Sequence, residues 1–137
     1  LIRIYPQIFL LFNSYQLSVC WNTTGITVAG ISGIAGSASN QLNSPYHLTL
    51  DAIGSLYICD TNNHRTQKYL KDGTSGTTVA GISGTCGTST AAYLCSPSSI
   101  LLDSSNNIYV VDTNYGRIQF WPPSATGGET ILSGNTS

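Results

Sequence analysis

The segment "LYICDTNNHRTQKY", residues 56–69, places a polar cluster between two strand-like runs, and it recurs as "IYVVDTNYGRIQFW", residues 108–121. Val, Ile and Tyr favour β-strands, whereas clusters of Asp, Asn and Thr favour turns. Each copy therefore predicts a β-hairpin. Two similar hairpins at a fixed distance along one chain indicate a repeat fold.

The repeat is longer than the hairpin. Residues 44–69 align with residues 96–121 at an offset of 52 without a gap, and ten residues are identical. The identical residues of the first copy are Ser44, Pro45, Leu50, Asp51, Tyr57, Asp60, Thr61, Asn62, Arg65 and Gln67. The string "TVAGISG" also occurs twice, at 27–33 and 78–84. The chain therefore contains more than two repeat units.

Each unit predicts four strands. In the first copy, "HLTLD", "LYICD", "RTQKYL" and "TTVAG" are strand-like runs separated by turn-like clusters. Four strands in about 50 residues, repeated without helical periodicity, are typical of a β-propeller blade. We therefore expect an all-β fold, a partial β-propeller of about two and a half four-stranded antiparallel blades.

The expected domain organisation follows from the alignment. Residues 44–95 form a complete blade with its connecting loop, residues 96–137 form most of a second blade, and residues 14–43 form the tail of a first blade with a loop. Residues 1–13 contain the apolar run "IFLLF", which is a degenerate strand or the remnant of a secretory signal. Because the sequence has no Met and begins at Leu1, we expect a fragment or a processed product.

The repeated pattern resembles the NHL repeat, a family of β-propellers. The segments "SPYHLTLDAIGSLYICDTNNHRTQKY" and "SPSSILLDSSNNIYVVDTNYGRIQFW" carry its Pro, Asp, Tyr, Asp, Asn, Arg and Gln positions in one register, and the first also carries its Gly. The sequence departs from the pattern at His47 and Ser99, where the family usually has a small residue such as Gly, and at Thr66, which replaces Ile or Val.

The marked polar residues are expected to stabilise the blades. Asp60, Asn62 and Arg65 recur in the second unit, whereas a catalytic site is normally assembled once, from unlike parts. We expect Asp and Asn to bond the backbone of their own turn, and Arg to reach the carboxylate or turn carbonyls. The full set of such structural residues is Asp51, Asp60, Asn62, Arg65, Asp103, Asp112, Asn114 and Arg117.

The two histidines do not predict a metal site. In peptide-amidating lyases, which have a related fold, a His directly after the Pro binds metal, but His47 stands one residue later than that position. Strand alternation would point it elsewhere, and no ligand set accompanies it. We expect an isolated strand-end residue at His47 and a turn-surface residue at His64. No catalytic residue, no metal site and no cofactor are predicted.

Cys86 and Cys95 predict a disulfide. Both lie in the loop "GTCGTSTAAYLCSP", whereas Ala35 and Asn43 replace both of them in the equivalent loop "GIAGSASNQLNSP". Cys59 is expected to be a buried thiol, and Cys20 has no evident local partner. A disulfide favours an oxidising compartment, and Asn22 and Asn135 are candidate N-glycosylation sites. We therefore expect an extracellular or secreted protein.

Composition disfavours some classes of function. Charged residues make up only 8% of the chain and the net charge is −1, which disfavours a nucleic-acid partner. The apolar run is too short for a transmembrane helix. The NHL resemblance implies a non-enzymatic scaffold that binds a protein or a small ligand, with the remaining blades supplied by a longer chain. The alternatives are a fragment of a propeller enzyme resembling the amidating lyases and, less favoured, an RNA-binding NHL domain.

Overall fold

The computed structural model describes the backbone of residues 2–4, 9–13 and 16–20 and the complete residues 25–134. It is almost entirely β-structure, with two antiparallel four-stranded sheets. Blade A consists of β5 (Pro45–Leu50), β6 (Leu56–Asp60), β7 (Arg65–Tyr69) and β8 (Gly76–Gly81). Blade B consists of β9 (Pro97–Leu102), β10 (Ile108–Asp112), β11 (Arg117–Trp121) and β12 (Glu129–Ser133).

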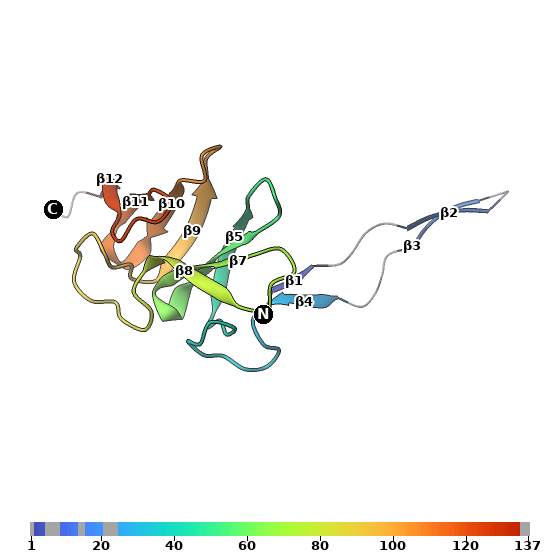
Figure 1. Cartoon of the computed structure of the whole chain (residues 1–137), viewed down its shortest axis with the longest axis horizontal. Helices are drawn as coiled ribbons and strands as arrows, with labels where there is room; N and C mark the ends of the chain where they lie inside the picture. The colour runs from blue at the N-terminus through green and yellow to red at the C-terminus, as the bar shows by residue number, and fades with distance from the viewer. Residues whose placement is uncertain (1, 5–8, 14–15, 21–24, 135–137) are drawn as a thin grey trace.

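The strands of each blade follow one another in space in the order in which they occur in the sequence. The two blades lie side by side, and the first strand of blade A contacts the first strand of blade B (Figure 1). This is the arrangement of neighbouring blades in a propeller, and the described residues do not close a ring. The prediction of an all-β, partial propeller fold is therefore confirmed.

The hairpins at residues 56–69 and 108–121 form the centres of blades A and B. β6 pairs with β7 from Leu56↔Tyr69 to Asp60↔Arg65, and β10 pairs with β11 in the matching register. A short 3₁₀ helix joins the two strands in each blade, at Thr61–Asn63 and at Thr113–Tyr115. The segment expected to be a simple turn is thus one turn of helix, which ends in a left-handed residue, His64 in blade A.

The core is divided between two clusters on the two faces of blade A. On one face, Tyr57 and Cys59 pack against Ile100, Val110 and Trp121, which belong to blade B. On the other face, Leu56, Ile58 and Tyr69 pack against Ala29 and Leu42, which precede blade A. Every residue of β6 is buried because both of its faces are covered.

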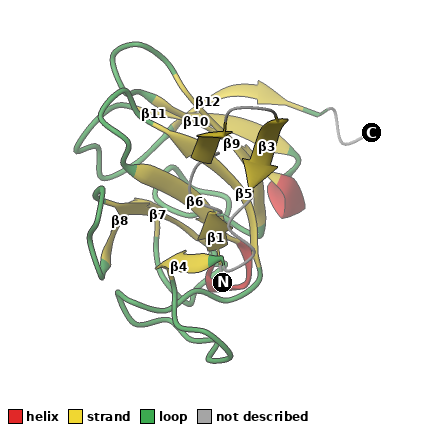
Figure 2. Cartoon of the chain, turned by 90° about the vertical axis from the view of Figure 1, so that its right-hand side faces the viewer, coloured by secondary structure: helices red, strands yellow, loops and turns green. Residues whose placement is uncertain are grey.

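The N-terminal strands differ in pairing from the blades. β4 (Ile26–Ala29) is the repeat counterpart of part of β8, yet it pairs with β1 (Ile2–Ile4). β3 (Gln16–Cys20) pairs instead with β2 (Phe9–Asn13), and this hairpin extends away from the blades in Figure 1. Figure 2 views the chain from the side of this hairpin, so that β3 lies in front of the blades. The assignment of residues 14–43 as the tail of a blade stays a prediction.

Candidate functional site

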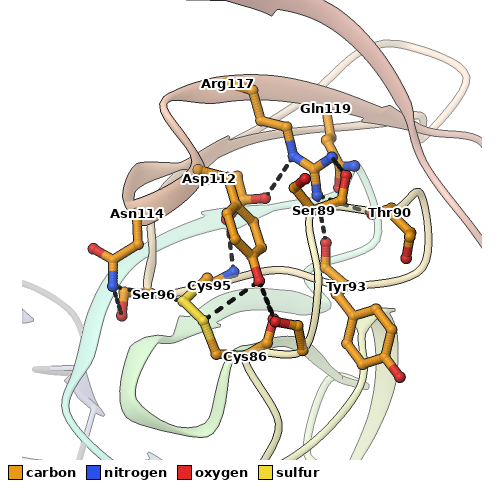
Figure 3. Close-up of polar contacts among 12 residues, drawn as sticks. Cys86, Ser89, Thr90, Tyr93, Cys95, Ser96, Asp112, Asn114, Arg117 and Gln119 are labelled. Carbon is orange, nitrogen blue, oxygen red and sulfur yellow. Dashed lines mark hydrogen bonds and ion pairs between the residues drawn. A yellow bond between two sulfur atoms is a disulfide. The ribbon is translucent and has the colours of Figure 1, made fainter. Parts of the chain in front are cut away.

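The polar residues that recur in both repeat units converge on the loop that enters each blade. In blade B, Arg117 Nε donates to Asp112 Oδ2 at 2.9 Å, and both side chains are buried. The other carboxylate oxygen, Asp112 Oδ1, accepts the Cys95 backbone N–H at 2.6 Å. The two terminal nitrogens of Arg117 donate to three backbone carbonyls of the same loop (Figure 3). These carbonyls belong to Ser89, Thr90 and Tyr93.

Blade A repeats this geometry. Arg65 Nε donates to Asp60 Oδ2 at 2.7 Å, and Asp60 Oδ1 accepts the Asn43 backbone N–H at 2.7 Å. The terminal nitrogens of Arg65 donate to the carbonyls of Ser37, Ala38 and Gln41, each 52 residues before its counterpart in blade B. We call each Asp–Arg pair with its carbonyls a loop clamp.

The loop clamp differs in one respect from the sequence-based expectation. Asp60 and Asp112 were expected to bond the backbone of their own turn, but neither 3₁₀ helix has a side-chain cap from its Asp. Both carboxylates instead accept from the loop that connects the preceding outer strand to the blade. Each aspartate is the last residue of its strand and lies buried beneath that loop. Its oxygens are desolvated there and need the N–H donors that the loop provides.

The other two aspartates of the repeat, Asp51 and Asp103, stabilise the turn that follows the first strand of each blade. Asp51 Oδ1 accepts the N–H groups of Ile53 and Ser55, and Asp103 Oδ1 accepts those of Ser105 and Asn107. The Asn107 side chain, with the backbone N–H donors, holds the pKa of Asp103 below its ordinary value.

The asparagines of the repeat bond to the start of their own blade rather than to their own turn. Asn62 Nδ2 donates to Ser44 Oγ at 2.9 Å, and Asn114 Nδ2 donates to Ser96 Oγ at 3.1 Å. Each bond therefore ties the 3₁₀ helix to the residue before the first strand of its blade.

The expectations for cysteine are confirmed where the residues are described. Cys86 and Cys95 form a disulfide with a Cα–Cα distance of 4.6 Å. Cys59 is a free, buried thiol, and burial raises its pKa to about 12. Cys20 lies in β3 opposite Phe9, and its side chain is outside the described part of the structure. The candidate glycosylation sites Asn22 and Asn135 also lie outside the described residues.

Both histidines make contacts between the blades that sequence reasoning missed. His64 was expected at the surface of a turn, but it is half-buried and its Nδ1 accepts the Ser96 N–H at 3.1 Å. His47, expected as an isolated strand-end residue, lies within β5, and its Nδ1 accepts the Ile100 N–H at 3.3 Å. Among the described residues, no three His, Cys, Asp or Glu side chains gather into a metal site.

A cleft of about 700 Å³ lies between the outer parts of the two blades. Its lining includes Tyr57, Lys68, Val79, Asn106, Trp121 and Pro123. This volume lies within the range of ordinary small-ligand and peptide sites, which combine apolar walls with a few polar groups. No sequence pattern predicted this cleft, because its lining comes from β6–β8 of one unit and from strand ends and turns of the next.

Lys68 supplies the positive charge in the cleft. Its Nζ lies 4.9 Å from the centre of the Tyr57 ring and 3.5 Å from Asp51 Oδ2. The Tyr57 oxygen beside the ammonium, together with Asp51, holds the pKa of Lys68 above its ordinary value, although burial opposes the shift. Lys68 therefore stays a cation at neutral pH and remains partly exposed.

Taken together, the two blades and their loop clamps define a repeat protein of the partial-propeller class. A scan against protein-family models and a search of curated proteins return no match for this chain. The resemblance to the NHL repeat therefore depends on the sequence pattern alone. In the described residues, no helix has the length and apolar character needed to cross a membrane.

Proposed function

We propose that this chain is part of an NHL-type propeller that serves as a non-enzymatic binding scaffold. The buried carboxylates support the proposal, because both oxygens of Asp60 and of Asp112 accept N–H donors from within their own repeat unit and its entering loop. Both carboxylates thus serve to hold the blade and its loop together.

The cleft between the blades is the proposed binding site, and it is the observation that carries the proposal. Tyr57 and Trp121 give it aromatic walls, and Pro122 and Pro123 add rigid apolar surface. Lys68 and the side chain of Asn106 supply polar groups at the cleft. An extended protein segment with an apolar side chain and a carboxylate matches this combination.

The disulfide supports an extracellular or luminal location. Disulfides persist in oxidising compartments and are rare in the reducing cytosol. Cys86–Cys95 lies in the loop held by the Arg117 clamp, so the cross-link and the clamp stabilise the same segment. A scaffold exposed to an extracellular environment gains from a connecting loop that resists local opening.

A peptide library displayed on phage tests the proposed binding site. Thr77 lines the cleft and is exposed, so Thr77→Phe fills it, whereas Thr74 lies in an exposed turn and gives a matched control. Selected peptides should bind the native chain and Thr74→Phe equally and lose at least about tenfold affinity for Thr77→Phe, which corresponds to about 1.4 kcal/mol. Peptides that bind Thr77→Phe undiminished, or the absence of any selected peptide, would contradict the proposal.

A further inference from the structure

β8 is the outer edge strand of blade A, and on one side no strand of the described chain pairs with it. The sheet order is β5-β6-β7-β8, and β8 pairs with β7 (Figure 2). Within the described residues, positions 77–81 make no backbone hydrogen bond outside this ladder. The N–H and C=O groups of β8 that point away from β7 are therefore open to a further strand.

The pairing fixes which backbone groups of β8 point outward. Gly76 N–H donates to the Ser39 carbonyl at 2.7 Å, outside the β7–β8 ladder, so Gly76 points away from β7. Because these groups alternate along a strand, Thr77 points toward β7 and Thr78 points outward again. The exposed Thr78 donates its hydroxyl to Gln67 Oε1 at 3.0 Å, which holds the side chain on its own sheet. The edge thus presents the backbone N–H and C=O of Thr78.

This open edge borders the cleft between the blades. Residues 77–81 line the cleft from blade A, and the turn at 122–126 and Asn106 line it from blade B. Tyr57 and Trp121 also line it, but they are only 4% and 2% exposed. A ligand in the cleft therefore meets the backbone of β8 and the exposed turn of blade B more than it meets the aromatic rings.

Blade B has a corresponding edge with different chemistry. β12 is the outer strand of blade B, and Glu129 stands on it where blade A has Thr77. A charged residue on an edge strand discourages pairing with other chains. Phe120 stands where blade A has Lys68. An arriving strand therefore meets no charge on β8 itself and a cation beside it, a combination that β12 does not offer.

From these observations we propose that the partner segment binds as a fifth strand on β8, by β-augmentation. This inference rests on the proposed function and specifies how the ligand of the cleft is held. The backbone of the segment bonds to Thr78, and every second side chain faces the cleft and the turn at 122–126. An acidic residue at one of these positions reaches Lys68, whose side chain is 27% exposed. The ligand is thus an extended, strand-forming segment with alternating character and one carboxylate.

N-methylation of the ligand tests the backbone bonds. Peptides selected on the native chain are resynthesised with one N-methyl group at each residue in turn, and their dissociation constants are measured by calorimetry. The change removes an N–H donor and leaves the side chain in place. In an added strand, N–H groups that point to β8 alternate with those that point to solvent. Affinity should therefore fall at least about tenfold at every second residue and change less than about threefold between them.

Thr78→Pro tests the same bonds from the side of the protein. Proline removes the outward N–H, and an edge strand tolerates it where that N–H makes no ladder bond. Thr78→Val keeps the N–H and loses the hydroxyl, and Thr130→Pro places the same change at the counterpart position of β12. Peptide affinity should fall at least about tenfold for Thr78→Pro and less than about threefold for the two controls.

The outcomes separate this inference from the proposed function. If N-methylation has no alternating effect while Thr77→Phe still blocks binding, the ligand lies in the cleft without joining the sheet, and only this inference is overturned. The absence of any selected peptide overturns both. Equal affinity of Thr78→Pro and Thr78→Val also overturns the added strand.

Two further results are decisive. If the native chain self-associates and Thr78→Pro makes it monomeric, a second copy occupies the edge, which overturns the proposal. If Thr78→Pro does not fold, the N-methyl series decides, because it uses the native chain.

Discussion

Asp112 and Arg117 form a buried ion pair across the turn between β10 and β11, with 2.9 Å between Arg117 Nε and Asp112 Oδ2. The rest of both side chains is directed at the loop that enters the blade, where they bond one N–H and three carbonyls. Asp60 and Arg65 repeat the arrangement in blade A. The repeat motif therefore binds each blade to its preceding connection.

Loss of one partner of the ion pair should be costly. Asp112→Ala leaves the Arg117 charge buried and removes the acceptor of the Cys95 N–H, so we expect the free energy of unfolding in urea to fall by about 3–5 kcal/mol. Asp60→Ala should have a similar effect. The double variant Asp112→Val/Arg117→Met should lose less free energy of unfolding than the sum of the losses in Asp112→Val and Arg117→Met, because no unpaired charge remains. A loss under about 0.5 kcal/mol for either single variant would contradict the role of the clamp.

The disulfide should add stability to a loop that is already clamped. Replacement of Cys86 and Cys95 by Ser should lower the free energy of unfolding by about 2–3 kcal/mol, since a short loop is no longer closed in the unfolded chain. Peptide mapping without reductant should recover the linked pair. Cys59→Val, which copies the residue of blade B, is the control and should cost less than about 1.5 kcal/mol.

Gly116 should be sensitive to substitution for a backbone reason. It ends the second 3₁₀ helix at φ 58°, and a Cβ added there meets no atom within 4 Å. Gly116→Ala should therefore cost about 1–2 kcal/mol of folding free energy through conformation alone. Gly116→Asn should cost less, because Asn tolerates the left-handed region. Equal thermal stability of Gly116→Ala and the native chain would contradict this explanation.

Asp103 should make stability depend on acid pH. Its pKa is lowered in the folded state by the Asn107 side chain and backbone N–H groups, so its contribution is complete above the ordinary pKa of about 3.9 and disappears as pH falls through the lower folded-state pKa. Asp103→Ala should therefore destabilise the chain more at pH 7 than at pH 3 in urea unfolding. Ser104→Ala, in the same turn but without loss of a carboxylate, should change the free energy of unfolding by the same amount at both pH values.

Much of the blade could be predicted from the sequence because local pattern and repeat agree. Tyr57, Asp60 and Arg65 recur in register with Tyr109, Asp112 and Arg117, so the hairpin and its polar turn were evident from two copies. The carbonyls that accept from Arg117 were not evident from the sequence, because any residue type can provide a backbone acceptor. The inter-blade role of His64 was hidden for a different reason: its counterpart Gly116 has no side chain to make the contact.

Other features depend on contacts between units. Asn63 donates to the Gly36 carbonyl at 2.8 Å, and Tyr115 reaches the equivalent Gly87 carbonyl at the same distance. Two unlike side chains thus fulfil one anchoring role, which an alignment by identity does not detect. The cleft beside Lys68 arises only when two blades are packed together.

Amide hydrogen exchange can show whether each buried Asp–Arg pair holds the loop that enters its own blade. Exchange is measured by mass spectrometry in the native chain, in Arg117→Gln and in Arg65→Gln. We expect Arg117→Gln to speed exchange in residues 84–96 and to leave residues 33–44 unchanged, whereas Arg65→Gln should do the reverse. Unchanged exchange in both loops, or equal loss of protection in both loops with either variant, would contradict the claim.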